Sequence, residues 1–388
     1  MKHLLVGVIG GGIMGRAIAY CAALNQCRAI LYEISPQALD NAKEEIHRLI
    51  KGQKEKGRFS EPEAKSLKEH ITFTGKMDDL AKSDLVIEAV VEDYQVKKNV
   101  FSEAESLVSK ETILGTNTSS LSVTAIASAC KDPSRVIGMH FFNPAYLMPL
   151  VEIVPGLASS MENVNKAREI VHGWNKTPVI AKDTPGFIVN RIARPFYGEA
   201  LRILEENIAD VPTIDWSMKV IGGFRMGPFE LMDLIGNDVN YKVTESVFEA
   251  FYYDSRYRPS VIQKRLVEAG RLGRKTGQGF YDYAPGAQNK EPLKDIELAR
   301  EIWFRIISML INEASDALQK NIASREDIDL AMMKGVNYPL GLLKWADEIG
   351  QEKILKKLTW LQQEYGEERY RPSLLLKKMA ENNQQFYS

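Results

Sequence analysis

The stretch LLVGVIGGGIMG, residues 4–15, decides the fold. Its apolar first half predicts a short strand, and a run rich in small helix formers follows its glycines. In such a strand–turn–helix unit the first glycine of G-x-G-x-x-G allows a tight turn, the second lets the backbone approach a pyrophosphate, and the third lets the helix pack closely. The helix N-terminus then faces the anion. The residues expected to contact a dinucleotide are Gly10, Gly12, Ile13, Met14 and Gly15.

Glycines also punctuate ordinary turns, so the stretch needs a second feature beside it. Another predicted strand, Arg28–Tyr32, leads into Glu33. This carboxylate falls about twenty residues beyond the glycines, where it would accept hydrogen bonds from the adenosine ribose. Its charge would repel a 2′-phosphate, and the next three residues include no arginine to neutralise one. The pattern therefore predicts NAD, not NADP.

Further strand candidates follow a charged helical stretch that runs from Pro36 to about His70. They are Ile71–Thr74, Asp84–Val90, Thr112–Gly115, Val136–Met139, Val151–Val154 and Val179–Ala181. Helical patterns, notably Val96–Ser109, lie between several of them, and this alternation is typical of an α/β doubly wound, mostly parallel sheet of Rossmann type. The turn signal at Asp183–Gly186 marks a boundary, so the dinucleotide-binding domain is expected over residues 1–183.

The rest of the chain has a helical pattern with an internal repeat. Glu199-Ala200 recurs 114 positions later as Glu313-Ala314, and the sequence Arg-Tyr-Arg-Pro-Ser occurs at both 256–260 and 369–373. These identities predict two copies of one all-α domain, over residues 184–284 and 285–388. At the same offset Asn190 corresponds to Phe304. We therefore expect copy one to face the functional site and copy two to be structural.

Composition excludes several classes of protein. The 388 residues carry 50 basic and 51 acidic side chains, which gives no general attraction to nucleic acid or anionic lipid. No stretch approaches the roughly 20 apolar residues of a membrane helix, and the first residues lack the pattern of a signal peptide. The three cysteines have no metal-type spacing, so neither disulfides nor a metal site is expected. The sequence predicts a cytoplasmic protein.

One of the five histidines has a setting that suggests chemistry. His140 follows the predicted strand Val136–Met139, and ligands bind at the carboxyl ends of strands in open α/β sheets. There an imidazole could take the proton of a substrate hydroxyl while hydride leaves the carbon. Glu152, in the next strand, could orient that imidazole. The plainer alternatives are a hydrogen-bonded core histidine and an exposed strand glutamate. The other histidines are expected on the surface: His3, His47, His70 and His172.

Polar residues also follow the strand Thr112–Gly115. The run Thr116–Ser120 offers hydroxyls and an amide at a strand end, where they suit hydrogen bonds to a nicotinamide and to a substrate oxygen. Taken alone, the run could equally be a helix N-cap, because Ser and Thr are preferred there.

Several longer motifs resemble those of the NAD-dependent L-3-hydroxyacyl-CoA dehydrogenases, over residues 1 to about 283. The motifs are residues 10–15, 88–92, 116–120, 140–144, 183–191 and 273–281. The remaining hundred or so residues resemble the duplicated C-terminal domain of some longer members. The resemblance implies a Rossmann domain, helical domains and oxidation of an L-3-hydroxyacyl-CoA to the 3-ketoacyl-CoA, with NAD reduced, in fatty-acid metabolism such as β-oxidation.

The resemblance also implies roles for individual residues. His140 would be the general base and Glu152 its orienting carboxylate, while Ser119 and Asn190 would bind the 3-oxygen. The residues implied on the cofactor side are Glu33 at the ribose and Glu92, Lys97 and Asn117 beside the nicotinamide. The charged stretch over residues 43–68 resembles the helical hairpin that covers coenzyme A. Its lysines could equally form a solvated face, because glutamates are interspersed among them.

One local departure and two alternatives remain open at this point. The loop Ala145–Pro149 carries Tyr146 and Pro149, where a smaller or more polar side chain is more usual, so the acyl preference is unsettled. The alternatives are an NAD-dependent dehydrogenase of a free hydroxy acid or sugar acid, and a non-catalytic NAD-binding protein. For members with a single helical copy, the resemblance implies dimers joined through the helical domain. The second copy here could replace that partner, so this chain is expected to be either a monomer or a homodimer.

Overall fold

The computed structural model describes residues 4–387, so His3 lies outside the described part. The chain forms two compact units, and the boundary between them in the sequence lies between Thr184 and Pro185. Within residues 4–387 no helix is long and apolar enough to cross a membrane. The same residues contain no group of three or more metal-ligating side chains, and all three cysteines are free thiols.

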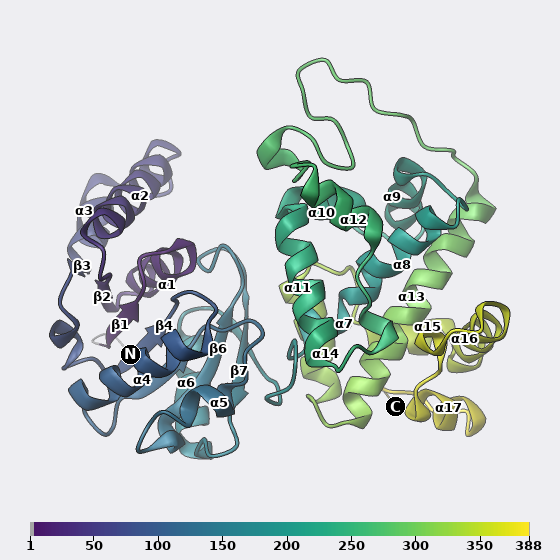
Figure 1. The fold of residues 1–388 in the computed structure, drawn as a ribbon. Helices are drawn as coiled ribbons and strands as arrows, with labels where there is room; N and C mark the ends of the chain where they lie inside the picture. The colour runs from purple at the N-terminus through teal and green to yellow at the C-terminus, as the bar shows by residue number, and fades with distance from the viewer. Residues whose placement is uncertain (1–3, 388) are drawn as a thin grey trace. The chain divides into compact units, whose positions relative to one another are not determined.

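The first unit is built on one eight-stranded sheet in the order β3-β2-β1-β4-β5-β6-β7-β8 (Figure 1). The strands are β1 Leu5–Ile9, β2 Arg28–Tyr32, β3 Ile71–Thr74, β4 Leu85–Glu88, β5 Ile113–Thr116, β6 Val136–Phe141, β7 Leu150–Pro155 and β8 Thr177–Ile180. Every predicted strand is present, with bounds that move by a few residues. The order reverses at β1, which creates a crevice at the carboxyl ends of β1 and β4.

Helices cover both faces of this sheet. They are α1 Ile13–Leu24, α2 Pro36–Glu55, α3 Glu61–Glu69, α4 Tyr94–Leu107, α5 Val123–Ala127 and α6 Met161–Gly173. One hydrophobic cluster packs α1, α2 and α6 against the strands, through side chains such as Ile18, Ile46 and Val164. Helix α4 contacts α5, and its buried Phe101 and Ala104 lie against β4 and β5. The predicted doubly wound α/β architecture is confirmed.

The charged stretch after Glu33 forms the two helices α2 and α3, as the implied helical hairpin predicts. Gly57 has a φ of +71°, a conformation that ends α2, and Ser60 begins α3 with a capping box to Glu63. His47 and His70 lie along this hairpin and are half-buried, so the expectation that both are surface histidines is too simple, whereas His172 is exposed.

One pair of strands runs against the parallel pattern. β6 and β7 are antiparallel, whereas the other six neighbouring pairs of strands are parallel. Residues 142–149 connect them, and a parallel pair would need a crossover of about a dozen residues or more. The antiparallel register places His140 directly opposite Glu152.

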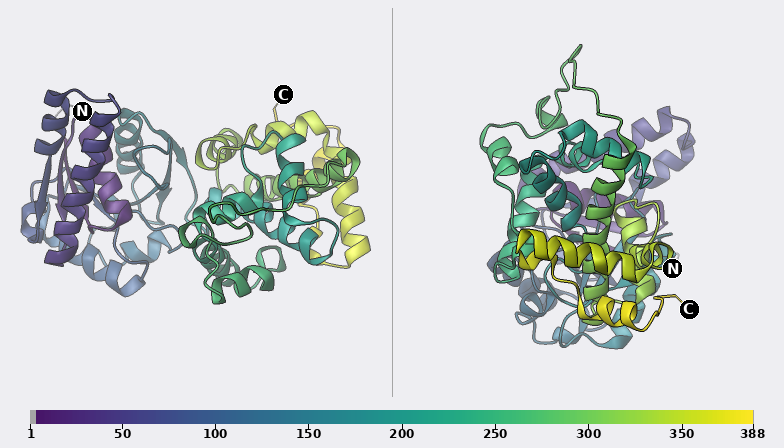
Figure 2. Two further views of the ribbon diagram at one scale, coloured as in Figure 1. Left: turned by 90° about the horizontal axis from the view of Figure 1, so that it is seen from above. Right: turned by 90° about the vertical axis from the view of Figure 1, so that its right-hand side faces the viewer.

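The second unit, coloured teal through yellow in Figure 2, is helical. It contains two sets of helices in the same order. Copy one comprises α7 Val189–Ile192, α8 Arg194–Glu205, α9 Val211–Val220, α10 Pro228–Ile235, α11 Asn237–Ala250 and α12 Val261–Glu268. Copy two comprises α13 Ile296–Gln319, α14 Arg325–Gly335, α15 Leu342–Ile349, α16 Gln351–Tyr365 and α17 Leu374–Glu381. The single helix α13 takes the place of α7 and α8, and it packs against both α8 and α9 of copy one.

The repeated aspartates and glycines perform the same task in both copies. Asp215 accepts the first free backbone N–H groups of α10, and Asp329 accepts those of α15. A Cβ on Gly227 or Gly341 would overlap the aspartate that caps its helix. The repeat at these positions therefore follows from one capping geometry that both copies need.

Each copy also contributes a buried glutamate to the other. Glu199 of α8 accepts a hydrogen bond from the Tyr370 hydroxyl at 2.5 Å, and Glu313 of α13 accepts one from the Tyr257 hydroxyl at 2.6 Å. Both tyrosines belong to the repeated Arg-Tyr-Arg-Pro-Ser sequence of the opposite copy. Arg305 of α13 adds an ion pair to Glu199 at 2.7 Å. These exchanged bonds join the two copies into one unit.

A further part of the repeat was missed in the sequence because its spacing differs. Phe280 and Tyr281 donate their backbone N–H groups to Asp233, and the matching pair near the C-terminus, 106 positions later, donates to Asp347. The segment before it is shorter in copy two, so a fixed offset of 114 cannot align the two ends.

Candidate active site

The antiparallel pair β6–β7 brings an imidazole and a carboxylate together. His140 Nδ1 lies 2.6 Å from Glu152 Oε2, the His140 side chain is 8% exposed and Glu152 is fully buried. A buried carboxylate is costly unless it is paired, and here the imidazole is a partner. The Nδ1 proton donated to Glu152 fixes the tautomer in which Nε2 is the basic nitrogen. The geometry thus excludes the alternative of an exposed strand glutamate.

Asn117 ties the end of β5 to the backbone beside this histidine. Its Oδ1 accepts the N–H of Phe141 at 2.8 Å, and its own N–H donates to the carbonyl of Glu88 in β4. The ring of Phe142 packs beside the imidazole, with 4.6 Å between the ring centroids. The carboxyl ends of β4, β5 and β6 are therefore held together around His140.

A single carboxylate holds the turn after β5. Glu92 Oε1 accepts the Ser119 N–H at 2.9 Å and the Thr118 hydroxyl at 2.6 Å, and the Ser120 hydroxyl at 3.1 Å. Burial raises the pKa of Glu92, but the Lys97 ammonium and these donors outweigh burial and hold that pKa below its ordinary value. Glu92 is therefore ionised at neutral pH and fixes the place of Ser119.

Lys97 lies under this turn instead of in the crevice. Its side chain is 1% exposed, and Nζ lies 2.6 Å from Glu88 Oε1 and 3.2 Å from Glu92 Oε2. Lys97 is connected to the turn of Ser119 through its ion pair with Glu92. The sequence analysis assigned no role to Glu88. Like Glu152, it is a carboxylate within an apolar strand, and this pattern was the available sign of a buried, paired glutamate.

The glycine turn has the shape that a dinucleotide needs. Gly10 has a φ of +108°, and a Cβ there would lie 2.7 Å from the Ala89 carbonyl oxygen. A Cβ on Gly15 would overlap Gly10, whereas one on Gly12 would meet nothing within 4 Å. The turn is thus closed on the protein side and open at Gly12, where the N-terminus of α1 begins without a side-chain cap.

The residues around the turn suit a bound dinucleotide such as NAD. Glu33 accepts the Gly11 N–H at 2.8 Å and the Ser35 N–H at 3.0 Å, so its carboxylate is fixed beside the turn. Two apolar side chains just beyond β2 and β4, the strands on either side of β1, are exposed, Ile34 by 78% and Val91 by 66%. Exposed apolar groups beside an uncapped helix N-terminus suit a ligand with flat rings and a pyrophosphate.

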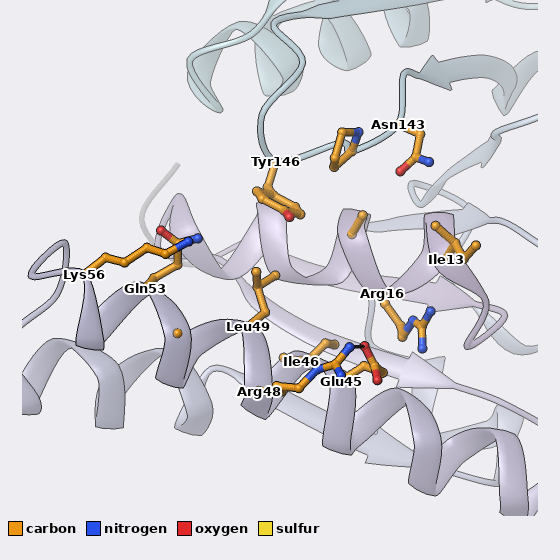
Figure 3. Close-up of a pocket in the computed structure, with 13 residues that line it drawn as sticks. Ile13, Arg16, Glu45, Ile46, Arg48, Leu49, Gln53, Lys56, Asn143 and Tyr146 are labelled. Atoms are coloured by element: carbon orange, nitrogen blue, oxygen red, sulfur yellow. Dashed lines mark hydrogen bonds and ion pairs between the residues drawn. The ribbon is translucent and has the colours of Figure 1, made fainter. Parts of the chain in front are cut away.

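A cavity of about 380 Å³ opens beside the glycine turn, between α1, α2 and the loop that follows His140 (Figure 3). Tyr146 and Asn143 approach it from the loop, Arg16 from α1 and Gln53 from α2. The Tyr146 ring rests edge-on against Tyr20, with 5.2 Å between centroids. The unusual loop residue noted in the sequence is thus a wall of this cavity.

Two polar groups in the cavity lack protein partners. Gln53 Oε1 is buried without a hydrogen bond, and the half-buried Arg16 guanidinium has no hydrogen bond or ion pair within residues 4–387. Arg48, by contrast, is paired with Glu45. An unpaired buried amide oxygen and an unpaired cation in one cavity indicate a ligand that carries both a hydrogen-bond donor and a negative charge.

Comparison with known proteins decides the family. The model of the 3-hydroxyacyl-CoA dehydrogenase NAD binding domain matches residues 5–184, and that of the 3-hydroxyacyl-CoA dehydrogenase C-terminal domain matches residues 186–283 and 302–385. The chain belongs to the 3-hydroxyacyl-CoA dehydrogenase family. As a member it is an NAD-dependent oxidoreductase of fatty-acid metabolism, as the sequence motifs predicted.

Individual members of the family resemble most or nearly all of the chain. The 3-hydroxyadipyl-CoA dehydrogenase of Escherichia coli K12 is 40% identical and the match covers 97% of each chain. A 3-hydroxybutyryl-CoA dehydrogenase of Bradyrhizobium diazoefficiens is 40% identical over 72% of this chain and 94% of its own. A crystal structure described as 3-hydroxybutyryl-CoA dehydrogenase from E. coli K12 matches with a TM-score of 0.92 and 37% identity, over 98% of this chain and 99% of that one.

The family's C-terminal domain therefore occurs twice in this member. Asn190, predicted at the substrate oxygen, lies on α7 of copy one, in the second unit. Its role stays a prediction. The first unit holds five of the other residues predicted for the site: His140, Glu152, Ser119, Glu92 and Asn117.

Proposed function

We propose that His140 and Glu152 carry out the chemistry of this dehydrogenase. His140 Nε2 takes the proton of the C3 hydroxyl of an L-3-hydroxyacyl-CoA as hydride leaves that carbon, and the C3–O bond becomes a carbonyl. Glu152 stabilises the imidazolium that forms. When bound, NAD supplies the hydride acceptor. The 2.6 Å pair between His140 and the buried Glu152 is the observation that carries this proposal.

Two further residues complete the proposed site. Ser119 would donate a hydrogen bond to the 3-oxygen, and its backbone is fixed for that task by Glu92. Asn190 would donate a second hydrogen bond from copy one of the helical domain. Donors fixed before the reaction stabilise the charge that develops on this oxygen. Phe304 of copy two has no such capacity, which supports a structural role for that copy.

The cavity beside the glycine turn is the proposed site of the coenzyme A portion. Arg16 would bind a phosphate, and Gln53 would accept a hydrogen bond from an amide of the pantetheine arm. Several lysines of the α2–α3 hairpin are paired instead, among them Lys54 with Glu61 and Lys65 with Glu69. Lys56 lies at the rim of the cavity.

Coenzyme A dependence tests the proposal against the free-acid alternative. The enzyme is expected to oxidise NADH with acetoacetyl-CoA and not with free acetoacetate. An Arg16→Ala variant is expected to raise KM for acetoacetyl-CoA by about tenfold at nearly constant kcat, because a charge-assisted hydrogen bond in a partly buried site contributes about 1.5 kcal/mol. The measurement is steady-state NADH consumption.

The matched control is Arg28→Ala, which removes an exposed arginine outside the cavity and should leave KM unchanged. Equal turnover of free acetoacetate would rule out the coenzyme A site. The same assay across acyl-CoAs of different length, with and without a terminal carboxylate, would define the acyl preference.

We also propose that copy two takes the place of a partner's helical domain. The exchanged bonds of Glu199 and Glu313 support this, because each copy satisfies groups of the other. The expected result is a monomer in light scattering at micromolar concentration. A stable dimer would show that the second copy does not substitute for a partner chain.

A further inference from the structure

Three charged side chains, two of them buried, lie together at the carboxyl end of β4. Lys97 bridges Glu88 at 2.6 Å and Glu92 at 3.2 Å. The side chains of Glu88 and Lys97 are each 1% exposed, and that of Glu92 is 35% exposed. We call this group the Glu88–Lys97–Glu92 cluster.

The cluster contains one more negative charge than positive charge. The other hydrogen-bond donors to these carboxylates are neutral: Glu88 accepts the Val90 N–H at 2.7 Å and the Thr116 hydroxyl at 2.7 Å, while Glu92 accepts the hydroxyls and N–H groups of the turn after β5. Such donors stabilise carboxylates without cancelling their charge. A single negative charge is therefore spread over the two glutamates.

The position of this charge is set by the sheet. Glu88 is the last residue of β4, which lies between β1, the strand that enters the glycine turn, and β5. In an open α/β sheet a dinucleotide lies across the carboxyl ends of these strands, with its second half beyond the switch point. The cluster thus lies on the nicotinamide side, and in a partly buried site its charge is weakly screened.

Oxidised and reduced nicotinamide differ in charge, since the oxidised ring is a cation and the reduced ring is neutral. We infer that the Glu88–Lys97–Glu92 cluster discriminates between these two forms, so that its excess negative charge strengthens the binding of NAD⁺ relative to NADH. This inference rests on the site proposed above only for the place of the nicotinamide. The cluster acts by charge and takes no part in the transfer of hydride or proton.

The test is a variant that removes one charge and keeps the shape. Glu88→Gln can keep its amide oxygen on Lys97 and Val90, and its nitrogen can donate to the Thr116 hydroxyl. The cluster then becomes neutral. The ratio of the Kd for NAD⁺ to the Kd for NADH is expected to rise by about tenfold, because the variant removes a unit charge whose Coulomb attraction to the cationic ring is weakly screened in a partly buried site.

Both constants are measured on the protein without acyl-CoA, by NADH fluorescence and by displacement of NADH with NAD⁺. Failure of the proposed catalytic roles would not change this readout. Thr116→Val, which removes a bond of Glu88 but no charge, should leave the ratio unchanged, as should Glu169→Gln, which removes an exposed charge on α6.

An unchanged ratio in Glu88→Gln, even with both affinities weakened, would overturn the inference and leave the cluster a structural support. If that variant does not fold, Glu92→Gln removes the same charge at the more exposed carboxylate and must shift the ratio in the same direction. A shift in the opposite direction in either variant also overturns it.

Discussion

Replacing His140 with Gln is expected to lower kcat by about 10²–10⁴-fold in both directions, while KM for acetoacetyl-CoA and the Kd for NADH change less than about twofold. Glutamine can still hydrogen-bond to Glu152 and fill the space, but it cannot take a proton from the 3-hydroxyl. The loss should therefore fall on the chemical step. Stopped-flow measurement of NADH absorbance after acetoacetyl-CoA is mixed with preformed enzyme–NADH isolates that step.

His172→Gln provides the control, because this histidine is exposed on α6 of the same unit. It should retain full activity. A His140→Gln enzyme with wild-type kcat would revive the non-catalytic alternative and would reduce the pair with Glu152 to a structural contact.

The largest expected effect on stability belongs to Glu199. This carboxylate is 2% exposed and binds Arg305 and Tyr370 of copy two. Arg305 lies 2.7 Å from both Glu199 and Glu206, so Glu199→Ala leaves it with Glu206 alone and takes the buried carboxylate away from Arg369 and the Tyr370 hydroxyl as well. Removal of one partner of a buried ion pair destabilises by about 3–5 kcal/mol, and the remaining bond to Glu206 places this loss near the lower figure. Urea denaturation followed by tryptophan fluorescence measures it, since four of the five tryptophans, at positions 216, 303, 345 and 360, lie in the helical unit.

The stabilisation by Glu199 should also depend on pH. Burial raises the pKa of Glu199, but Arg305 and the neighbouring arginines outweigh burial and hold that pKa below its ordinary value of 4.5. The folded state then releases this proton more readily than the unfolded chain. The stabilisation by Glu199 is therefore complete at pH values above the pKa of the unfolded chain, and it is lost as the pH falls through the lower pKa of the folded state. Destabilisation by Glu199→Ala should thus shrink in acid.

Two comparisons make this prediction specific. Glu313→Ala removes the equivalent carboxylate of copy two, which is fully buried and binds Arg256 and Tyr257, and it should cause a loss of similar size. Glu249→Ala, at an exposed site on α11, should change the free energy of unfolding by less than about 0.5 kcal/mol. A Glu199→Ala midpoint equal to that of Glu249→Ala would contradict the assigned role.

The sequence predicted the strands well because buried parallel strands are continuous apolar runs, and β2 agrees with its predicted bounds. It did not predict the direction of β7. The length of residues 142–149 was the available signal, since eight residues are too few for a parallel crossover. That direction decides the site, because only the antiparallel register sets His140 opposite Glu152.

The contacts of individual side chains were harder to predict than their positions along the strands and helices. Lys97 is predicted on the nicotinamide side, and the sequence does not show that two carboxylates, Glu88 and Glu92, surround its ammonium group under the turn of Ser119. No sequence motif marks Arg16 or Gln53, because they line one cavity only where α1, α2 and the loop of Tyr146 come together. In the same way, the repeat revealed Glu199 and Glu313 as equivalent but could not show that each bonds to the other copy.

The exchange of glutamates and tyrosines has a practical consequence for handling this protein. The connection between the helical copies, residues 285–295, is mostly exposed and lies outside helices, so a protease would cut there first. Because the copies hold each other through buried ionic and apolar contacts, the severed pieces would stay together. The polypeptide could thus be produced as two separately encoded fragments that reassemble by complementation.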